Sequence, residues 1–264
     1  NLYPNQFVRF TKKSDPSISH TMRYIHSSNT LIPFNYYHGQ EVFGIKPRNY
    51  EQEMALELLL DDNIKLVSLS GIAGTGKTLL AIAAGLQKVI EENKYARLVI
   101  SRPIFPLGKD LGYLPGSKTE KFNPWMQPIY DNMDILLSHH DQVGPTNPKN
   151  KRKTSIDDFM DYGYVELEPL TYIRGRSLPD QFMIIDEAQN LTPHEMKTII
   201  TRAGENTKIV LTGDPYQIDI PYLDSSSNGL SVAVEKLKVE DIVGHITLIK
   251  GERSALADLA AKYF

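Results

Sequence analysis

The sequence contains no cysteine among its 264 residues. This absence excludes disulfides, thiolate metal sites and a cysteine nucleophile, and it agrees with an expected cytoplasmic location. No apolar run approaches the roughly 20 residues that a membrane-spanning helix needs. The first residues also lack the basic and apolar regions of a secretion signal. We therefore expect a protein that is neither exported nor inserted in a membrane.

The sequence also lacks a zinc-protease pattern and a strong excess of one charge. His194 has no second histidine four residues later, and the adjacent His139 and His140 would diverge on a helix, so we interpret them as solvated side chains. The formal net charge is −3. This charge argues against a uniformly basic nucleic-acid-binding protein but is compatible with a local basic groove.

One stretch has a specific chemical pattern. Residues 71–78 read Gly-Ile-Ala-Gly-Thr-Gly-Lys-Thr and match the P-loop pattern G-x-x-x-x-G-K-[ST] at every fixed position. A buried strand is predicted before it at 64–69 and an apolar helix after it at 79–86, which is the context that a P-loop requires. This context argues against the alternative of a glycine-rich turn that matches by chance.

The residue types of the P-loop suit a nucleoside triphosphate. The glycines let the backbone wrap around phosphate oxygens, and the N–H groups at the start of the helix attract an anion. Lys77 is expected to reach the β- and γ-phosphates, and the hydroxyl of Thr78 to bind Mg²⁺. The predicted ATP-binding residues of the loop are Gly71, Ile72, Ala73, Gly74, Thr75, Gly76, Lys77, Thr78 and Leu79.

Strands and helices alternate along most of the chain. Further apolar runs predict strands at 97–101, 182–185, 208–211 and 245–249. The alternation indicates an α/β fold with a mostly parallel sheet of five strands and right-handed crossovers. Residues 1–45 have only short extended patches among Ser, Asn, Tyr and Pro, and we interpret them as an irregular N-terminal arm or linker before an ATPase domain at 46–264.

Polar residues follow these strands at the edge where parallel sheets bind ligands. Asp186 comes directly after the strand at 182–185 and is expected to bind Mg²⁺ through water, while Glu187 polarises the water that attacks the γ-phosphate. A carboxylate that caps the next helix is the structural alternative for this pair. Gln217, after the strand at 208–211, is expected to sense the γ-phosphate, and an ordinary polar loop residue is the alternative.

Three arginines are candidates for stabilising the charge that develops in the transition state, as an arginine finger does. Arg253, shortly after the last predicted strand, is the first choice. Arg202 and Arg176 are the substitutes. Surface salt bridges are the alternative for Arg253 and Arg202, because nothing local in the sequence fixes where either side chain points.

A series of short motifs extends over the chain from residue 46 onward. They lie at 46–52, 71–78, 101–103, 111–116, 123–126, 173–177, 185–190 and 211–219. In this series the chain resembles the PhoH family of ATPases. The resemblance implies a single RecA-like P-loop core akin to helicases of superfamily 1, with Gln52 reading the adenine edge and Tyr50 lying against the base. Relatives are described as ATP-dependent RNA helicases.

The N-terminal residues resemble a linker that follows a PIN ribonuclease domain in fused relatives. The first methionine is Met22, so we expect the sequence either to begin inside a longer polypeptide or to follow a trimmed end. PIN-bearing relatives couple unwinding to RNA cleavage. The given residues include no PIN domain, so nuclease activity is not expected of them.

The first functional hypothesis is an ATP-driven helicase or translocase on single-stranded RNA. A basic loop at 149–153 and a set of cations with one stacking ring would contact the strand. The members of this set are Arg102, Lys109, Lys121 and Trp125. A solvated loop and a core tryptophan are the alternatives. A nucleotide-dependent switch or assembly factor and a P-loop kinase compete as functions, although Asp-Glu followed by Gly-Asp-x-x-Gln favours water activation over a kinase.

The chain contains one P-loop and one Asp-Glu pair, with no repeat of either. Superfamily 1 motors place ATP between two RecA-like cores, so a single core leaves the γ-phosphate facing solvent. A head-to-tail neighbour could cover the phosphate and donate a cation, and such contacts close into a ring when the rotation allows. We therefore expect a ring, most simply a hexamer as the resemblance also implies, with Arg253 acting across the subunit boundary or in its own site.

Overall fold

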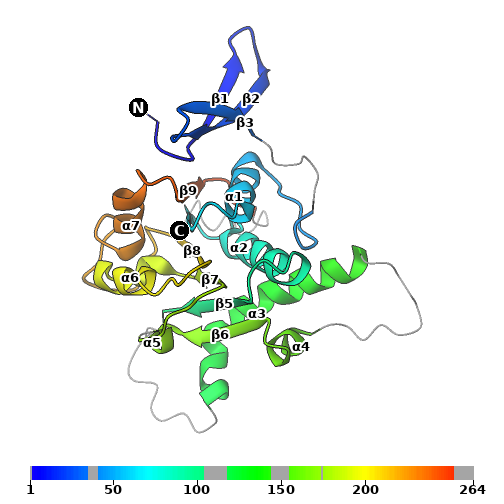
Figure 1. The fold of residues 1–264 in the computed structure, drawn as a ribbon, viewed down its shortest axis with the longest axis vertical. Coiled ribbons are helices and arrows are strands. Elements are labelled where there is room, and N and C mark those ends of the chain that lie inside the picture. Colours follow the sequence, from blue (N-terminus) through cyan, green and yellow to red (C-terminus); the bar gives the residue numbers. More distant parts are fainter. Residues whose placement is uncertain (1, 35–40, 104–117, 144–154, 174, 253–264) are drawn as a thin grey trace, which may run out of the picture.

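The computed structural model describes most of the chain as one α/β unit with a small additional sheet (Figure 1). The described residues are 2–34, 41–103, 118–143, 155–173 and 175–252, without the side chains of 16–18, 118–124, 141–143, 171 and 172.

A parallel sheet of six strands forms the centre, in the order β6-β5-β7-β8-β4-β9. The strands are β4 (Leu66–Gly71), β5 (Arg97–Arg102), β6 (Val165–Pro169), β7 (Gln181–Ile185), β8 (Lys208–Gly213) and β9 (Val243–Leu248). The predicted α/β fold with a parallel sheet is confirmed, but the predicted number of five strands was wrong. The sequence hides β6 because Glu166 and Glu168 alternate with Leu167 on this edge strand, so no apolar run marks it.

Helices cover both faces of this sheet. They are α1 (Tyr50–Leu60), α2 (Lys77–Leu86), α3 (Lys118–Val143), α4 (Ile156–Asp161), α5 (Leu170–Ile173), α6 (Pro193–Ile200) and α7 (Gly229–Leu237), with short helical turns η1 (Gln87–Glu91) and η2 (Ala188–Asn190). Successive strand residues point to opposite faces. Ile184 and Val210 pack with α1, α2 and α3, whereas their neighbours Met183 and Ile209 pack with α6 and α7. The two faces bury two separate apolar clusters, which explains the continuous apolar runs of the central strands.

A capping box marks the start of α6. Thr192 is the N-cap: its hydroxyl accepts the Glu195 N–H at 3.2 Å, and its own N–H donates to the Glu195 carboxylate at 3.0 Å. Pro193 occupies the first turn. This capping box fixes where the helix begins after the Asp-Glu segment.

Helix α3 contains two prolines. It has 26 residues and includes Pro124 and Pro128. Prolines inside a helix remove a backbone donor and normally end it. Here the buried residues Met126, Ile129 and Met133 pack on the α1/α2 side of the sheet, and this tertiary packing outweighs the local cost.

The predicted irregular N-terminal arm was also wrong. An antiparallel three-stranded sheet is formed by β1 (Phe7–Lys12), β2 (Asp15–Ile25) and β3 (Thr30–Pro33), at one end of the long axis of the molecule (Figure 1). Most of its β1 residues are exposed, so the strands lack the apolar alternation that a half-buried sheet would show. Buried Arg23 connects this sheet to α1 through an ion pair with Asp61 at 2.9 Å. The domain boundary at residue 46 stays a prediction.

Candidate nucleotide-binding site

The P-loop connects β4 to α2 through glycines in the left-handed region. Gly74 and Gly76 have φ values of 81° and 88°. Gly71 has φ 147°, and a Cβ there would overlap the carbonyl oxygen of Leu248 at the end of β9. Only glycine fits these backbone positions without strain. The turn directs the N-terminus of α2 into a cleft, as anion binding requires.

Lys77 and Thr78 are adjacent in the sequence, but their side chains contact different partners. The Lys77 ammonium donates to the carbonyl oxygens of Gly71 at 2.6 Å and Ile72 at 2.9 Å, so it lies across the loop. The Thr78 hydroxyl donates to Oδ1 of Asp186 at 2.8 Å. The predicted magnesium ligands Thr78 and Asp186 are thus brought together from α2 and the end of β7.

Hydroxyl groups of two neighbouring elements hold the Asp186 carboxylate in place. Its carboxylate is almost fully buried, and the Thr212 hydroxyl on β8 also donates to Oδ1, at 2.6 Å. A hydroxyl and a carboxylate are hard oxygen donors, and Mg²⁺ in nucleotide sites takes one or two such protein ligands and completes its shell with phosphates and water. The residues present fit this cation. Within the described part of the chain, no cluster of three or more His, Cys, Asp or Glu side chains could hold a metal by itself.

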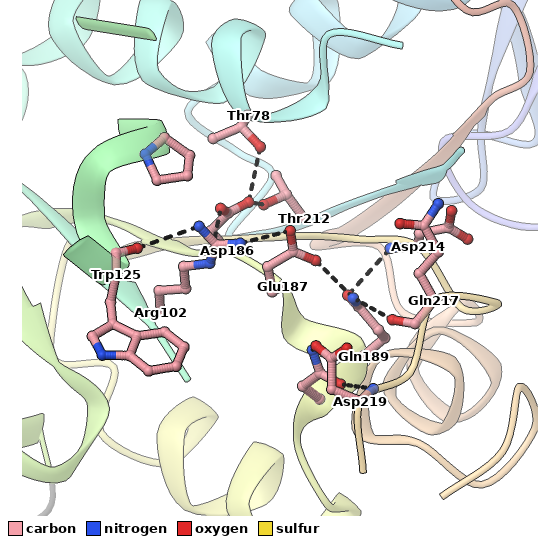
Figure 2. Close-up of polar contacts among 12 residues, drawn as sticks. Thr78, Arg102, Trp125, Asp186, Glu187, Gln189, Thr212, Asp214, Gln217 and Asp219 are labelled. Atoms are coloured by element: carbon pink, nitrogen blue, oxygen red, sulfur yellow. Dashed lines mark hydrogen bonds and ion pairs between the residues drawn. The ribbon is translucent and has the colours of Figure 1, made fainter. Parts of the chain in front are cut away.

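Glu187 follows in the left-handed region, with φ 52° and ψ 41°, an uncommon conformation for a residue with a side chain. Its Oε1 accepts from the Arg102 guanidinium at 3.0 Å and its Oε2 accepts from the Gln189 amide at 2.7 Å (Figure 2). Glu187 lines a cleft of about 230 Å³ together with Lys77, Thr78 and Gln217. The residues predicted as general base, phosphate ligand and γ-phosphate sensor therefore line the same cleft.

A buried glutamine that the sequence reasoning missed connects these parts. Gln189 donates to Glu187 and to the Gln217 carbonyl oxygen at 2.9 Å, and its Oε1 accepts the Asp214 N–H at 3.2 Å. A Cβ at Gly213 would overlap this Oε1, so the glycine makes room for the link. Gln189 fixes the loop after β8 relative to the end of β7 (Figure 2).

The predicted adenine-reading residue lies beside a second cleft, of about 520 Å³, on the other side of the P-loop. Gln52 is buried, donates to the Thr75 carbonyl oxygen at 3.0 Å and accepts the Arg48 N–H at 2.8 Å. Tyr50 is exposed, and its ring lies under the guanidinium of Arg9 at 4.3 Å. Tyr50 does not line the cleft. The roles of Gln52 and Tyr50 toward the base stay predictions.

Helix α3 lines both clefts, which the sequence did not indicate. Asn132 faces the cleft that Glu187 lines, and Ile135 and His139 face the cleft beside Gln52. Positions 132, 135 and 139 share one face of a helix, beside the buried apolar stripe of α3. The exposed His139, which we interpreted as a solvated side chain, is therefore part of a cleft wall.

Two of the three candidate arginine fingers, Arg202 and Arg176, lie away from this site. Arg202 is next to the amino ends of β7 and β8, where its carbonyl oxygen accepts the Leu178 N–H at 3.1 Å, so it is at the edge of the sheet opposite the P-loop. Arg176 is exposed and pairs with Glu168 at 2.7 Å beyond the far edge strand β6. Arg253 lies outside the described residues.

The structure changes one of the predicted RNA contacts. Arg102 was expected to meet a strand, but it is largely buried and its guanidinium contacts both carboxylates after β7. Trp125 is half-buried on α3. The side chain of Lys121 is not described, and Lys109 and the loop at 149–153 lie outside the described residues.

A family model described as "PhoH-like protein" matches residues 44–261 of the chain. The chain belongs to the PhoH family. It is 51% identical over 261 residues to "Protein PhoH2" of Bacillus subtilis (strain 168), a match that covers 98% of this chain and 56% of that protein. It is 41% identical to "Protein PhoH2" of Mycolicibacterium smegmatis, over 84% of this chain and 48% of the relative. The chain thus spans about half the length of these relatives.

The fold is also similar to a solved protein of low sequence identity. The large terminase of a thermophilic bacteriophage matches with a TM-score of 0.50 at 12% identity, over 82% of this chain and 50% of the terminase. Together with the P-loop between β4 and α2, this likeness gives the chain the α/β fold of a P-loop protein. Within the part of the chain that the structure describes, no helix has both the length and the apolar content to cross a membrane.

Proposed function

We propose that this chain is an ATPase that cleaves ATP in the cleft between the P-loop and the carboxyl ends of β7 and β8. The observation that carries the proposal is that Glu187 and Gln217 line the same cleft as Lys77 and Thr78. A triphosphate held by the P-loop would direct its terminal phosphate at a carboxylate and a carboxamide. These groups suit the orientation and deprotonation of an attacking water.

The roles follow from what each side chain can donate or accept. Lys77 and the N-terminus of α2 hold phosphate oxygens, Glu187 accepts the proton of the attacking water, and Gln217 hydrogen-bonds the γ-phosphate and that water. When bound, Mg²⁺ held by Thr78 and Asp186 would neutralise charge on the phosphates. Gln52 selects adenine. The products are ADP and inorganic phosphate.

A second candidate is a nucleotide-dependent switch or assembly factor that binds ATP and a protein partner and does no work on nucleic acid. It would use the same P-loop but would need no general base. The carboxylate of Glu187 is held at both oxygens at the wall of the cleft, and this favours hydrolysis over binding alone.

In this proposal the ATPase acts on single-stranded RNA, as a helicase or a translocase. The support is the family resemblance together with cations that precede, begin and follow α3 in the sequence. Lys109 precedes α3 in the sequence, Lys121 belongs to its first turns, and the basic loop at 149–153 follows it. These positions remain candidate contacts for RNA phosphates. Trp125 remains a candidate ring for stacking on a base. Arg102 is removed from this set because its guanidinium is engaged with Glu187.

Two further parts of the proposal concern the whole protein. The relatives are about twice as long as this chain, which agrees with an upstream PIN ribonuclease domain in the full-length protein. A hexameric ring would bring a neighbouring arginine to the cleft. Arg253 remains the first choice, and the position of Arg202 at the opposite edge of the sheet restricts it to a role across a subunit boundary.

The proposal is tested by phosphate release from ATP with and without single-stranded oligouridylate, at about 50 and 200 mM salt. We expect release that RNA stimulates, with weaker stimulation at the higher salt because phosphate contacts release counterions. Lys77→Ala should abolish release under all conditions. Release that no nucleic acid stimulates would leave an ATPase but remove the RNA motor, and binding of ATP without any release would favour the switch.

A further inference from the structure

The guanidinium of Arg102 lies between the two carboxylates at the end of β7. Its Nη2 donates to Oε1 of Glu187 at 3.0 Å, and its Nε lies 3.9 Å from Oδ2 of Asp186. Its Nη1 donates to the carbonyl oxygen of Trp125 on α3 at 3.3 Å. The Arg102 side chain is 21% exposed, so these contacts are partly shielded from water. Figure 2 shows the group lying between α3 and the two carboxylates.

The backbone fixes the position of this side chain. Arg102 is the last residue of β5, and β5 pairs with β7 in a register that places Ser101 opposite Ile185. The Asp186 N–H continues this ladder by donating to the Ser101 carbonyl oxygen at 2.9 Å. Arg102 and Glu187 thus leave adjacent strands at the same edge, and their separation cannot change without breaking the sheet.

Arg102 does not line the cleft that Glu187, Lys77 and Gln217 share. It therefore lies behind the carboxylate and would act on the reaction through it. The two oxygens of Glu187 have different donors: Arg102 on Oε1 and the buried Gln189 on Oε2. A carboxylate held at both oxygens cannot rotate about its last bond without losing one of them. The charged donor is the stronger of the two.

We propose that Arg102 is a positioning residue that orients the Glu187 carboxylate toward the cleft and, through the Trp125 carbonyl, ties this orientation to the place of α3. The inference rests on the proposed ATPase function. Without Arg102 the carboxylate still faces the cleft but samples several orientations, so fewer bound ATP molecules meet a correctly placed base. Misplacement of a catalytic group by about 1 Å can lower a rate by roughly 10²-fold.

The test compares ATP hydrolysis by the parent, Arg102→Gln and Arg102→Lys. We expect Arg102→Gln to lower kcat by about 10- to 100-fold with the KM for ATP changed less than about threefold, because the P-loop contacts are untouched. Lysine keeps the charge but lacks the planar fork, so Arg102→Lys should recover only part of the rate. Added methylguanidinium should raise the rate of Arg102→Ala but not that of the parent.

The decisive arm is a double-mutant cycle with Glu187→Gln, measured in single turnovers. If Arg102 acts through Glu187, Arg102→Gln should cause little further loss in the Glu187→Gln background. An equal loss in both backgrounds, or a parent-like kcat for Arg102→Gln, would overturn the inference.

A matched control lies on the same strand. Arg97, the first residue of β5, pairs with Glu166 at 2.8 Å at the amino edge of the sheet, away from the cleft. Arg97→Gln should leave kcat unchanged. Thermal unfolding of Arg97→Gln and Arg102→Gln shows whether either substitution impairs folding in general. If Lys77→Ala and Glu187→Gln hydrolyse ATP at the parent rate, the proposed function fails. If they lose activity while Arg102→Gln keeps it, this inference alone fails.

Discussion

At the scale of single residues, the most unusual side chain outside the cleft is Lys208, at the start of β8. It has no exposed surface. Its ammonium donates to the carbonyl oxygens of Leu58 and Asp61, both at 2.8 Å, and so caps the C-terminal end of α1. Burial lowers the pKa of Lys208 to about 7, although the nearby carboxylates of Asp61 and Asp62 oppose this shift.

This pKa predicts a pH dependence of stability. Between about pH 7 and pH 10.5 the unfolded chain binds more protons at Lys208 than the folded chain, so the free energy of unfolding rises with pH. The expected increase from Lys208 is about 2 kcal/mol between pH 7 and 9. Urea unfolding of the parent and of Lys208→Met across this window checks it, because methionine does not titrate. The same rise in both proteins would contradict the prediction.

A site residue could be found from the sequence only where it belongs to a motif that specifies its chemical role. Lys77, Thr78, Asp186 and Glu187 could be predicted because a P-loop and a strand-terminal Asp-Glu each specify chemistry and place. Gln189 could not, since a lone glutamine has no distinctive spacing and its role comes from contacts with the loop after β8. Arg102 belongs to the motif at 101–103, but this motif does not indicate that its guanidinium contacts Glu187.

At the scale of elements, the buried side chain of Arg23 connects the N-terminal sheet to α1 and its C-cap. Arg23 on β2 contacts Asp61 at 2.9 Å and Glu57 at 3.5 Å on α1, and its Nη2 donates to Asn5 at 2.7 Å. Isolated exposed ion pairs contribute little, but removing one partner of a buried pair leaves the other charge without compensation.

We expect Arg23→Ala to lower the free energy of unfolding by about 2–4 kcal/mol, because the buried Asn5 side chain and the half-buried Asp61 carboxylate lose their donor. The control is Arg9→Ala on β1 of the same sheet, whose contacts with Ser19 and the Tyr50 ring are exposed. That variant should change stability by less than about 1 kcal/mol. Urea denaturation measures both, and equal small effects would show that the sheet is not anchored by Arg23.

Helix α3 gives a second prediction at this scale. Ile135 is 45% exposed and lines the cleft beside Gln52, so it is available to pack against a base without supporting the core. Ile135→Ala should raise the KM for ATP roughly threefold to tenfold, as expected when a few methylene groups lose apolar contact, with kcat nearly unchanged. Ser138→Ala on the same helix, outside both cleft linings, is the control. Equal KM values for Ile135→Ala and the parent would show that Ile135 on α3 does not contact the base of ATP.

The elements that the sequence did not reveal share a physical property. Edge strand β6 and the N-terminal strands are mostly half-buried or exposed, so hydrophobic periodicity is weak there. Helix α3 contains Pro124 and Pro128, which locally favour a break, and its length is set by packing on the α1/α2 side of the sheet. In contrast, the central strands are buried on both faces and could be read directly from their apolar runs.

At the scale of the whole molecule, the prediction is a ring in which one subunit completes the site of its neighbour. The test mixes Lys77→Ala subunits, which keep Arg253, with Arg253→Ala subunits, which keep the P-loop. If Arg253 acts across the boundary, some ATPase activity should return on mixing two inactive preparations. A mass measurement that finds only monomer at working concentration, with full activity, would rule out the ring.

The central claim is that the cleft shared by the P-loop and Glu187 hydrolyses ATP. The most direct test measures ATP binding and phosphate release side by side for the parent and Glu187→Gln. Because glutamine keeps the size of the side chain but cannot accept the proton of water, the account predicts nearly equal ATP affinity and a loss of turnover of about 10²–10⁴-fold. Phosphate release by Glu187→Gln at the parent rate would contradict the account.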